Sequence, residues 1–442
     1  MLVFCADIFV ILATKRQNMY RKNRFKICLL IIGFLLTASC NKDMFDAEDY
    51  KKIVEIAQPV NNIDESHAWD LTSSYYITVE AGTSSTEIRR LQILSANPAA
   101  GERAVILGDF PMSAKEKKYV SFVAPSLLTN FYAARIDANG TYTLVEFSKD
   151  QRTIGFSHPL ATQAVVDNRL IGNQSFSYCF EDEMPQPGDY DYNDVVLRIS
   201  IERAAKNQIM LNITLAAVGS LSQVAAGIRM ENYKYDDIIS VTTIDGETFD
   251  DGYKKSSLPF IDGNELLVRG IDNAAVINLF EDAHWATGVA HYASEGYIPR
   301  YKYNVSKTTS SEHDMMSPRT ISYVVTFKES AQLDYFTLNL LDPFIIVEYM
   351  GAFMEVHAAY RYRSVTALHD YVQPVNATIL PWAIVVPDGS FRYPLDGVNI
   401  GFAKEGALFG AYMTDKHAFG NWASNSGTAL DWYLYPTGNM VY

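Results

Sequence analysis

The chain has 442 residues and 48% hydrophobic residues, with 37 Lys and Arg against 51 Asp and Glu, a formal net charge of −14. This charge argues against nucleic acid as a partner, because binding to phosphate backbones needs a basic surface. The length leaves room for two or more domains with sizeable cores.

Residues 1–39 have the features of a signal peptide that ends at a lipidation site. The apolar run 27–37 follows the basic cluster 21–26 and leads into Thr37-Ala38-Ser39-Cys40. The run is too short for a spanning helix, which takes about 20 residues, and small residues before a cysteine suit a lipoprotein signal peptidase. We therefore expect Cys40 to become the lipidated first residue of the mature chain.

A different interpretation makes residues 2–13 a first transmembrane segment. That run is also short and contains Asp7, and it precedes Met19, which would begin a conventional signal peptide. We therefore predict Met19 as the true start.

The lipid anchor predicts a location on the outer membrane of a Gram-negative bacterium, because two acyl chains hold a protein stably on a membrane. The acidic residues soon after Cys40 resemble short signals that send some lipoproteins to the outer cell surface; an ordinary solvated tether explains them equally well. The sequence is compatible with a location on the periplasmic face and with one on the external face of this membrane.

Without residues 1–39 the chain keeps 31 Lys and Arg against 50 Asp and Glu, and two cysteines, Cys40 and Cys179. No disulfide can then join folded parts of one chain, so stability must come from sheet packing, with or without a metal. Cys179 lies between Tyr178 and Phe180 and is expected to be a buried apolar residue.

Alternation of apolar and polar residues predicts a mainly β protein made of short strands. Asp137-Ala138-Asn139-Gly140 is typical of a hairpin turn, because Asn and Gly tolerate positive φ. A short helix is expected only near 407–423. Many strands without amphipathic helices between them favour β-sandwiches. The predicted strands are 75–79, 119–123, 131–136, 141–147, 195–201, 209–215, 321–327 and 335–340.

The sequence divides into four predicted parts. A signal peptide covers 1–39 and a lipidated tether covers 40–60. A small β-sandwich domain is expected at 61–165 and a larger β-domain at 166–442, because Ser157-His158-Pro159 interrupts the strand pattern and a strong motif follows.

That motif is an acidic stretch, residues 180–196. Asp189, Asp191 and Asn193 would point the same way in an extended segment, with Asp194 beside them and Asp182 or Glu181 adding charge. Their oxygens would suit Ca²⁺, which accepts irregular shells of six to eight oxygen ligands.

The stretch is no EF-hand, because Asp194 and Ser200 stand where that loop needs Gly and Glu. The competing interpretation is a tight turn in which Asp and Asn side chains cap their own backbone.

Phe180-Glu181-Asp182 followed by residues 188–196, Gly-Asp-Tyr-Asp-Tyr-Asn-Asp-Val-Val, resembles the opening signature of the LruC domain family of bacterial lipoproteins. The resemblance covers about residues 166–442 and implies a jelly-roll-like β-sandwich in an envelope lipoprotein, with no established reaction. Asp342 stands where Asn is usual, and the residues after His357 lack the common Leu-Pro-Gly, which puts a role for that loop in doubt. Later segments that agree in order are 219–220, 226–228, 275–280, 342–345, 355–357, 380–384, 393–394, 419–423, 426–427 and 431–433.

We predict a non-enzymatic binding or adhesion module for a glycan or protein ligand. Trp422, Asp431, Trp432 and Tyr433 are candidate ligand-binding residues, since exposed rings can stack on sugars; filling the core is the competing role for these aromatics. An exposed strand edge in the small domain would favour a structural subunit of a surface assembly instead, and an aromatic-lined groove would favour a sugar binder.

A glycan hydrolase would need two carboxylates across a cleft, about 5 to 10 Å apart, and Glu281, Asp282 and Glu355 are candidates. The sequence contains no HExxH motif, no Gly-x-Ser-x-Gly elbow and no P-loop, which argues against those hydrolase and nucleotide-binding classes.

Overall fold

The chain divides into Met1–Ile56 and Ala57–Tyr442, and every structural feature below belongs to the second part. The predicted signal peptide, Cys40 and the tether to residue 60 lie outside the described residues. Within the described part of the chain, no helix is long and apolar enough to span a bilayer. The computed structural model describes residues 63–442 except 65, 165, 254–258, 262–264, 290–297, 308–314, 330–332, 359–366, 369–379 and 402–409, with backbone only for 161–164.

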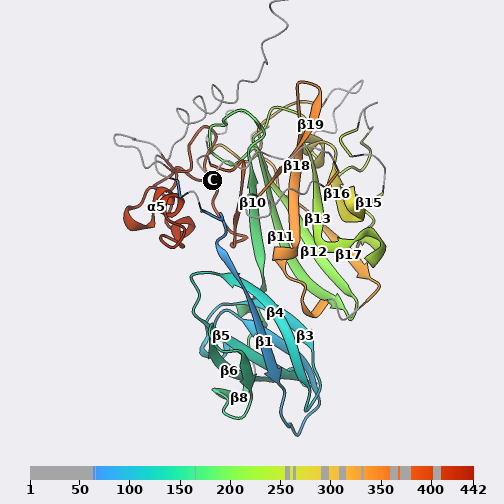
Figure 1. Cartoon of the computed structure of the whole chain (residues 1–442), viewed down its shortest axis with the longest axis vertical. Helices are drawn as coiled ribbons and strands as arrows, with labels where there is room; N and C mark the ends of the chain where they lie inside the picture. The colour runs from blue at the N-terminus through green and yellow to red at the C-terminus, as the bar shows by residue number, and fades with distance from the viewer. Residues whose placement is uncertain are drawn as a thin grey trace, which may run out of the picture. The chain divides into compact units, whose positions relative to one another are not determined.

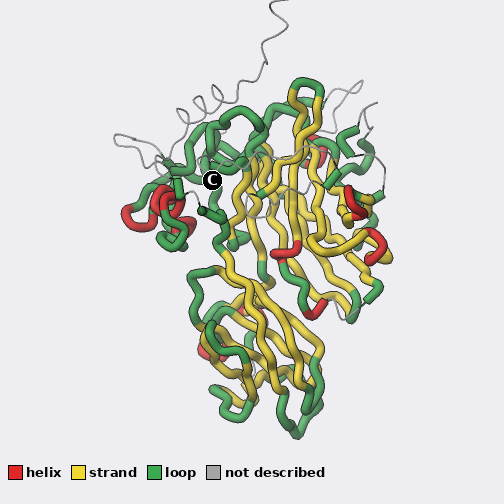
Figure 2. The backbone as a smooth tube through the Cα atoms, in the orientation of Figure 1, coloured by secondary structure: helices red, strands yellow, loops and turns green. Residues whose placement is uncertain are grey.

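The protein is mainly β, as predicted, with a few short helices between its strands (Figure 2). Among the described residues, two are α-helical, α4 (Ala283–Ala286) and α5 (Phe419–Ser424). The latter overlaps the segment 407–423, where a helix was expected, whereas α4 lies outside it, so the prediction of a helix only there is wrong. Short 3₁₀ helices lie at Pro98–Ala100, Asn168–Leu170, Tyr235–Asp237, Ile271–Asn273, Leu338–Leu340, Asp415–His417 and Trp432–Leu434.

The first strands of the described chain form two sheets, of three and six strands (Figure 1). Within the described residues, these strands pair only with one another. The three-stranded sheet has the order β4 (Lys117–Pro125), β1 (Thr72–Glu80), β7 (Thr153–Gly155), and the six-stranded sheet β8 (Ala161–Ala164), β6 (Tyr142–Ser148), β5 (Asn130–Asp137), β2 (Ile88–Leu94), β3 (Ala104–Pro111), β9 (Ile171–Asn173).

Alternation explains how these two sheets share a core. Along β1, Tyr75, Ile77 and Val79 are buried, because alternate side chains of a strand point to one face. They meet apolar residues of the six-stranded sheet, among them Leu91 and Phe131, in one hydrophobic cluster. Side chains from both sheets therefore fill the same interior.

The turn between β5 and β6 is the predicted hairpin. Its two strands are antiparallel, and Gly140 has a φ of 77°, which glycine adopts without strain. The Asp137 carboxylate accepts hydrogen bonds from the backbone N–H groups of Asn139 and Thr141 at 2.8 and 3.0 Å. The side chain of Asp137 thus fixes the turn.

The remaining strands form a six-stranded and a five-stranded sheet. Long antiparallel strands dominate both, in agreement with the predicted strands 195–201, 209–215 and 321–327. In sheet order, the six strands are β14 (Ile238–Thr243), β17 (Arg319–Phe327), β12 (Gln208–Val218), β11 (Val195–Ala205), β10 (Ser175–Phe180), β20 (Ala383–Val386), and the five are β15 (Leu267–Arg269), β16 (Ala274–Phe280), β13 (Ala225–Lys234), β18 (Leu341–Tyr349), β19 (Ala352–His357).

The strand predicted at 335–340 is wrong. Phe336 and Leu338 are buried, so the alternation in the sequence is real. The chain there makes a 3₁₀ turn at Leu338–Leu340, and the strand begins only at Leu341. Alternate burial over a few residues also arises in an irregular segment that crosses a core, which is why the pattern misled.

Candidate metal centre

The acidic stretch is the loop that joins β10 to β11, two neighbouring antiparallel strands of the six-stranded sheet. It is tied to the start of β20, where the Glu181 N–H donates to the Trp382 carbonyl at 2.8 Å and the Trp382 indole donates to the Gln186 carbonyl at 2.9 Å. Tyr190 and Tyr192 both have positive φ, 59° and 53°. The loop is therefore coiled, and the extended backbone assumed for its acidic residues does not form.

Glu181 lies at the centre of the coil. Its carboxylate is fully buried and accepts hydrogen bonds from the backbone N–H groups of Tyr190 and Tyr192 at 3.1 and 2.5 Å. The carboxylates of Asp189 and Asp191 approach it, with one oxygen from each of the three residues lying within 4.8 Å of the others. The coil thus brings Asp189 and Asp191 together, as expected, but around Glu181.

A second group shares the Glu181 carboxylate. Oxygens of Glu181, Glu183 and Asp194 also lie within 4.8 Å of one another. Asp194, only 8% exposed, accepts a hydrogen bond from the Asp182 N–H at 2.8 Å, so it also closes the loop backbone. Glu183 was not predicted as a ligand, and Glu181 was expected only as an alternative to Asp182; the signal for a central Glu181 was its place directly after the apolar residues 178–180.

Asp182 and Asn193 take other directions. The Ser220 hydroxyl donates to Asp182, which belongs to neither converging group. The Asn193 amide donates to the Pro394 carbonyl at 3.1 Å, and its buried Oδ1 has no hydrogen-bond partner among the described residues. Of the five predicted ligands, Asp189, Asp191 and Asp194 are therefore in the converging groups.

Some hydrogen bonds of the loop are those of turn architecture. The Asp191 carboxylate accepts the Asn193 N–H at 3.1 Å and the Gly397 N–H at 2.7 Å. The bond from Asn193 is local and typical of an Asx turn, whereas the bond from Gly397 joins the loop to a segment distant in the sequence. They hold the carboxylates in place and leave a metal-binding role open.

Two glycines allow this packing. A Cβ on Gly188 would overlap the Glu181 carboxylate, and a Cβ on Gly219 would overlap the Asn193 side chain and backbone. Both positions require glycine for close approach, because the neighbouring atoms are buried and cannot move away.

Burial and mutual repulsion disfavour ionisation of the loop carboxyls. Burial, then the charges of Asp191, Glu183 and Asp189, raise the pKa of Glu181 well above its ordinary value. Burial and Asp189 raise the pKa of Asp191 to about 8, and burial and Asp182 raise that of Glu183 to about 7. Burial also raises the pKa values of Asp189 and Asp194.

Lys302 is a basic residue whose pKa is affected by the charge of these carboxylates. Burial lowers its pKa, but its hydrogen bond to Asp396, at 2.6 Å, and the charges of Asp396, Asp194 and Asp191 raise it overall. Its ion pair is with Asp396. In the part of the chain that the structure describes, no Lys, Arg or His forms an ion pair with the carboxylates of the two groups.

The donor set selects a hard cation. All converging atoms are carboxylate oxygens, with no His nitrogen or Cys sulfur, which suits Ca²⁺ better than Zn²⁺. Two oxygens bound to one Ca²⁺ at about 2.4 Å each lie at most about 4.8 Å apart. The separations within each group are therefore compatible with a shared cation.

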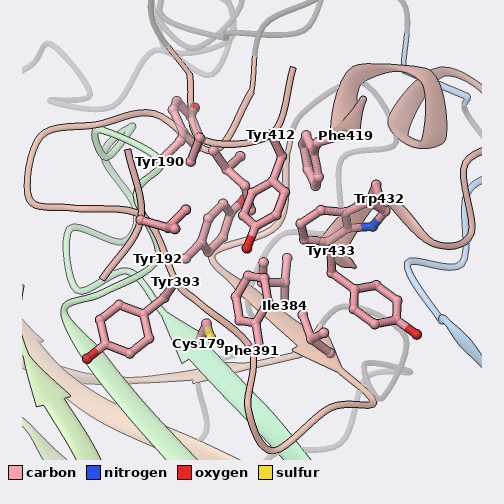
Figure 3. Packing of buried hydrophobic residues seen from close by; sticks show 14 of the residues in the cluster. Cys179, Tyr190, Tyr192, Ile384, Phe391, Tyr393, Tyr412, Phe419, Trp432 and Tyr433 are labelled. Carbon is pink, nitrogen blue, oxygen red and sulfur yellow. The ribbon is translucent and has the colours of Figure 1, made fainter. Parts of the chain in front are cut away.

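The predicted aromatic ligand residues near the C-terminus lie in the core. Trp422, Trp432 and Tyr433 are 1%, 0% and 6% exposed. Figure 3 shows Trp432 and Tyr433 packed with Phe391 and the rings around it. This placement favours the core-filling alternative, because a buried ring cannot stack on a sugar.

Asp431 is the partly exposed member of that predicted set. Its carboxylate lies 2.8 Å from the Nδ1 atom of His417.

Cys179 is buried in the same cluster as Trp432, and burial raises the pKa of its thiol. The expected apolar role of Cys179 is confirmed.

The carboxylates considered for a hydrolase are buried and engaged by the fold. Glu281 accepts the backbone N–H groups of Phe260 and Ile261 at 2.8 and 2.9 Å. Glu355 lies 2.9 Å from His357. Each of the two residues is at most 1% exposed. In the described residues, neither carboxylate therefore lines an open cleft that could hold a glycan.

The class defined by these features is a mainly β protein with a coiled acidic loop between two sheet strands. Residues 207–433, just over half of the chain, match the family described as "Domain of unknown function (DUF4842)", and the chain belongs to this family. The match begins after the acidic loop and includes Gly219 and Ser220, which contact it. The LruC resemblance remains a prediction.

No curated protein matches the chain. Among solved structures, it is similar to a crystallised Bacteroides ovatus protein called a "putative lipoprotein", with 15% identity and a TM-score of 0.48. The similarity covers 81% of this chain and 99% of that one.

Proposed function

We propose that this chain is a lipid-anchored lipoprotein of the outer membrane that acts as a non-enzymatic binding module, with its acidic loop held by Ca²⁺. The observation that carries the metal role is the convergence of Asp189, Asp191, Glu183 and Asp194 on the buried carboxylate of Glu181.

The hydrogen bonds of the loop favour ionised carboxylates. Glu181 and Asp191 each accept two backbone N–H groups, and an acceptor-only role suits the charged form of a carboxyl group. Repulsion among the five carboxyls opposes that charge. A divalent cation would resolve the conflict, because it neutralises the carboxylates without displacing the N–H donors.

The lipid anchor rests on the sequence around Cys40, and a mainly β domain with long loops is a common scaffold for binding at a cell surface. The hydrolase alternative has less support, because Glu281 and Glu355 are buried and hydrogen-bonded within the fold. The proposal includes the predicted architecture, a jelly-roll-like β-sandwich at 166–442 preceded by a small β-sandwich domain at 61–165.

Thermal unfolding of the full chain in nonionic detergent, with calcium or with chelator, tests the metal role. Calcium at roughly 100 times its Kd would stabilise the folded state by about 2.7 kcal/mol, since a ligand of the native state acts by mass action. We expect a higher Tm with calcium, and bound calcium in a titration.

Glu183→Gln is the informative variant, because it removes one charge with little change in shape. It should lose most of the calcium response and raise the Tm in chelator, where repulsion is unrelieved. Asp150→Asn is the matched control, since Asp150 is exposed in a turn outside the loop. A wild-type Tm that calcium does not move would contradict the metal role and leave turn architecture as the explanation.

A further inference from the structure

The outer face of the three-stranded sheet carries two exposed tyrosines. Alternation that buries Tyr75 and Ile77 of β1 turns Tyr76 outward, and β4 presents Tyr119 on the same side. Tyr76 and Tyr119 are 52% and 50% exposed. Their rings are therefore available to a ligand and lie outside the core.

The strand register holds these rings together. Tyr119 is opposite Thr78, and Tyr76 is opposite Ser121, so the two tyrosines are diagonal neighbours. Their ring centroids are 6.3 Å apart and the ring planes differ by 16°. Diagonal pairs of this kind are within reach of aromatic side chains, so each ring limits the rotamers of the other.

A hollow of about 360 Å³ lies beside the rings. β7 closes one side, where the Thr78 N–H donates to the Arg152 carbonyl at 2.8 Å and Thr78 pairs with Thr153. The Arg152 guanidinium, one of whose five N–H groups bonds the Lys149 carbonyl at 3.0 Å, adds donors at the rim. The hollow is lined by Ser74, Tyr76, Thr78, Tyr119, Arg152 and Thr153.

This lining has the chemistry of a carbohydrate site. Every one of its side chains carries a hydrogen-bonding group, two of them add a ring face, and none is aliphatic. Sugars present apolar C–H faces surrounded by hydroxyls, so they need both kinds of contact. A protein partner would be expected to meet a more apolar centre.

The strand edge argues the same way. β4 is an outer strand of its sheet, but it carries Lys117 and Lys118 and ends at Pro125. Lysines and proline on an edge discourage pairing with a strand from another protein. Lys117 also pairs with Glu80 at 3.0 Å, and Arg152 is the one basic residue in the lining of the hollow, so the lining favours a neutral ligand over a polyanion.

We propose that this face binds a glycan chain, with Tyr76 and Tyr119 as stacking residues and Ser74, Thr78 and Arg152 as hydrogen-bonding residues. The inference rests on the proposed role of the chain as a binding module, and it names a glycan as the class of ligand. It places the ligand at a site separate from the acidic loop.

The test is affinity electrophoresis of the full chain in nonionic detergent. The gels contain one soluble probe each: mixed-linkage β-glucan, xyloglucan, galactomannan, arabinoxylan, polygalacturonate or heparin. We expect retardation by at least one neutral probe. Tyr76→Ala and Tyr119→Ala should each weaken it about tenfold, the scale of one lost aromatic contact, and Tyr119→Trp should retain it.

Tyr301→Ala is the matched control, because Tyr301 is 40% exposed and lies outside the hollow. No retardation by any probe, or retardation that both alanine variants keep, would overturn the glycan site. Glu183→Gln should keep glycan binding while losing its calcium response, so failure of the metal role and failure of the glycan site give different results.

Discussion

The acidic loop around Glu181 and the pair Asp342 and Glu355 both contain buried carboxylates, but they differ in how this charge is balanced. In the loop, Glu181, Asp191 and Asp194 are buried, whereas Glu183 and Asp189 are exposed. His357 lies between Asp342 and Glu355, with its two ring nitrogens 2.9 Å from a carboxylate oxygen on each side. The loop has no such cation among the described residues. Buried carboxylates are stable only with a counter-charge or a proton, so the comparison singles out the loop as the place where an external cation would act.

The pKa shifts express the same contrast. Burial alone would lower the pKa of His357, but the charges and hydrogen bonds of Asp342 and Glu355 raise it to about 9. Burial would raise the pKa of Glu355, but His357 and two backbone N–H groups lower it overall. In the acidic loop every shift goes upward, because each carboxyl has mainly carboxyls for neighbours.

His357→Gln should have the largest effect on this comparison. It removes the imidazolium that lies between two buried carboxylates, although Asp342 keeps an ion pair with Arg229 at 3.7 Å. Removing one partner of a buried ion pair costs about 3–5 kcal/mol. Chemical denaturation should show this loss in the free energy of unfolding. His158→Gln, at an exposed position, should change it little.

A triple variant that also carries Asp342→Asn and Glu355→Gln should be less destabilised than His357→Gln alone, because the two carboxylates that faced the imidazolium are then neutral amides. A triple variant as unstable as the single variant would mean that shape, and not charge, fixes this cluster.

The pH dependence of stability should separate the two regions. The folded-state pKa of His357 rises from 6.5 to about 9, so its contribution is complete below pH 6.5 and is lost as the pH rises through about 9. In calcium-free protein the pKa of Asp191 rises from 3.8 to about 8 on folding. The folded state therefore binds a proton at the Asp191 carboxyl more tightly than the unfolded state does. Stability there should fall as the pH rises from about 4 to about 8.

Unfolding measured across this range, with calcium and with chelator, checks both windows. Calcium should flatten the lower window, because bound carboxylates are ionised in both states, and His357→Gln should remove the upper one. A calcium-free protein whose stability rises steadily from pH 4 to pH 8 would contradict the repulsion within the loop.

Gly188→Ala should have a smaller effect. Its Cβ would overlap the Glu181 carboxylate, and overpacking of this kind costs about 1–3 kcal/mol. Gly155→Ala is the matched control, since nothing lies within 4 Å of its added Cβ. We expect Gly188→Ala to lower the Tm and weaken the calcium response; an unchanged response would show that the Glu181 carboxylate can move without loss of the site.

The mainly β class, the hairpin at Asp137–Gly140 and most of the long strands were predictable, because they depend on local alternation and turn chemistry. The segment 335–340 was not, since Phe336 and Leu338 alternate in burial although the chain makes a 3₁₀ turn at Leu338–Leu340. The roles of Trp422 and Trp432 were also beyond the sequence, because an aromatic residue is equally compatible with a core and with a surface.

For the candidate site, composition and spacing determined that residues 180–196 would gather charge at the start of a strand. Only the tertiary structure decided which carboxylates meet. The left-handed residues Tyr190 and Tyr192 coil the loop around Glu181, and Trp382, which directly precedes β20 and is distant in the sequence, makes the contacts that hold it. Sequence periodicity reports which side of a strand a residue occupies, whereas convergence in a loop depends on backbone turns and on neighbours that arrive from elsewhere in the chain.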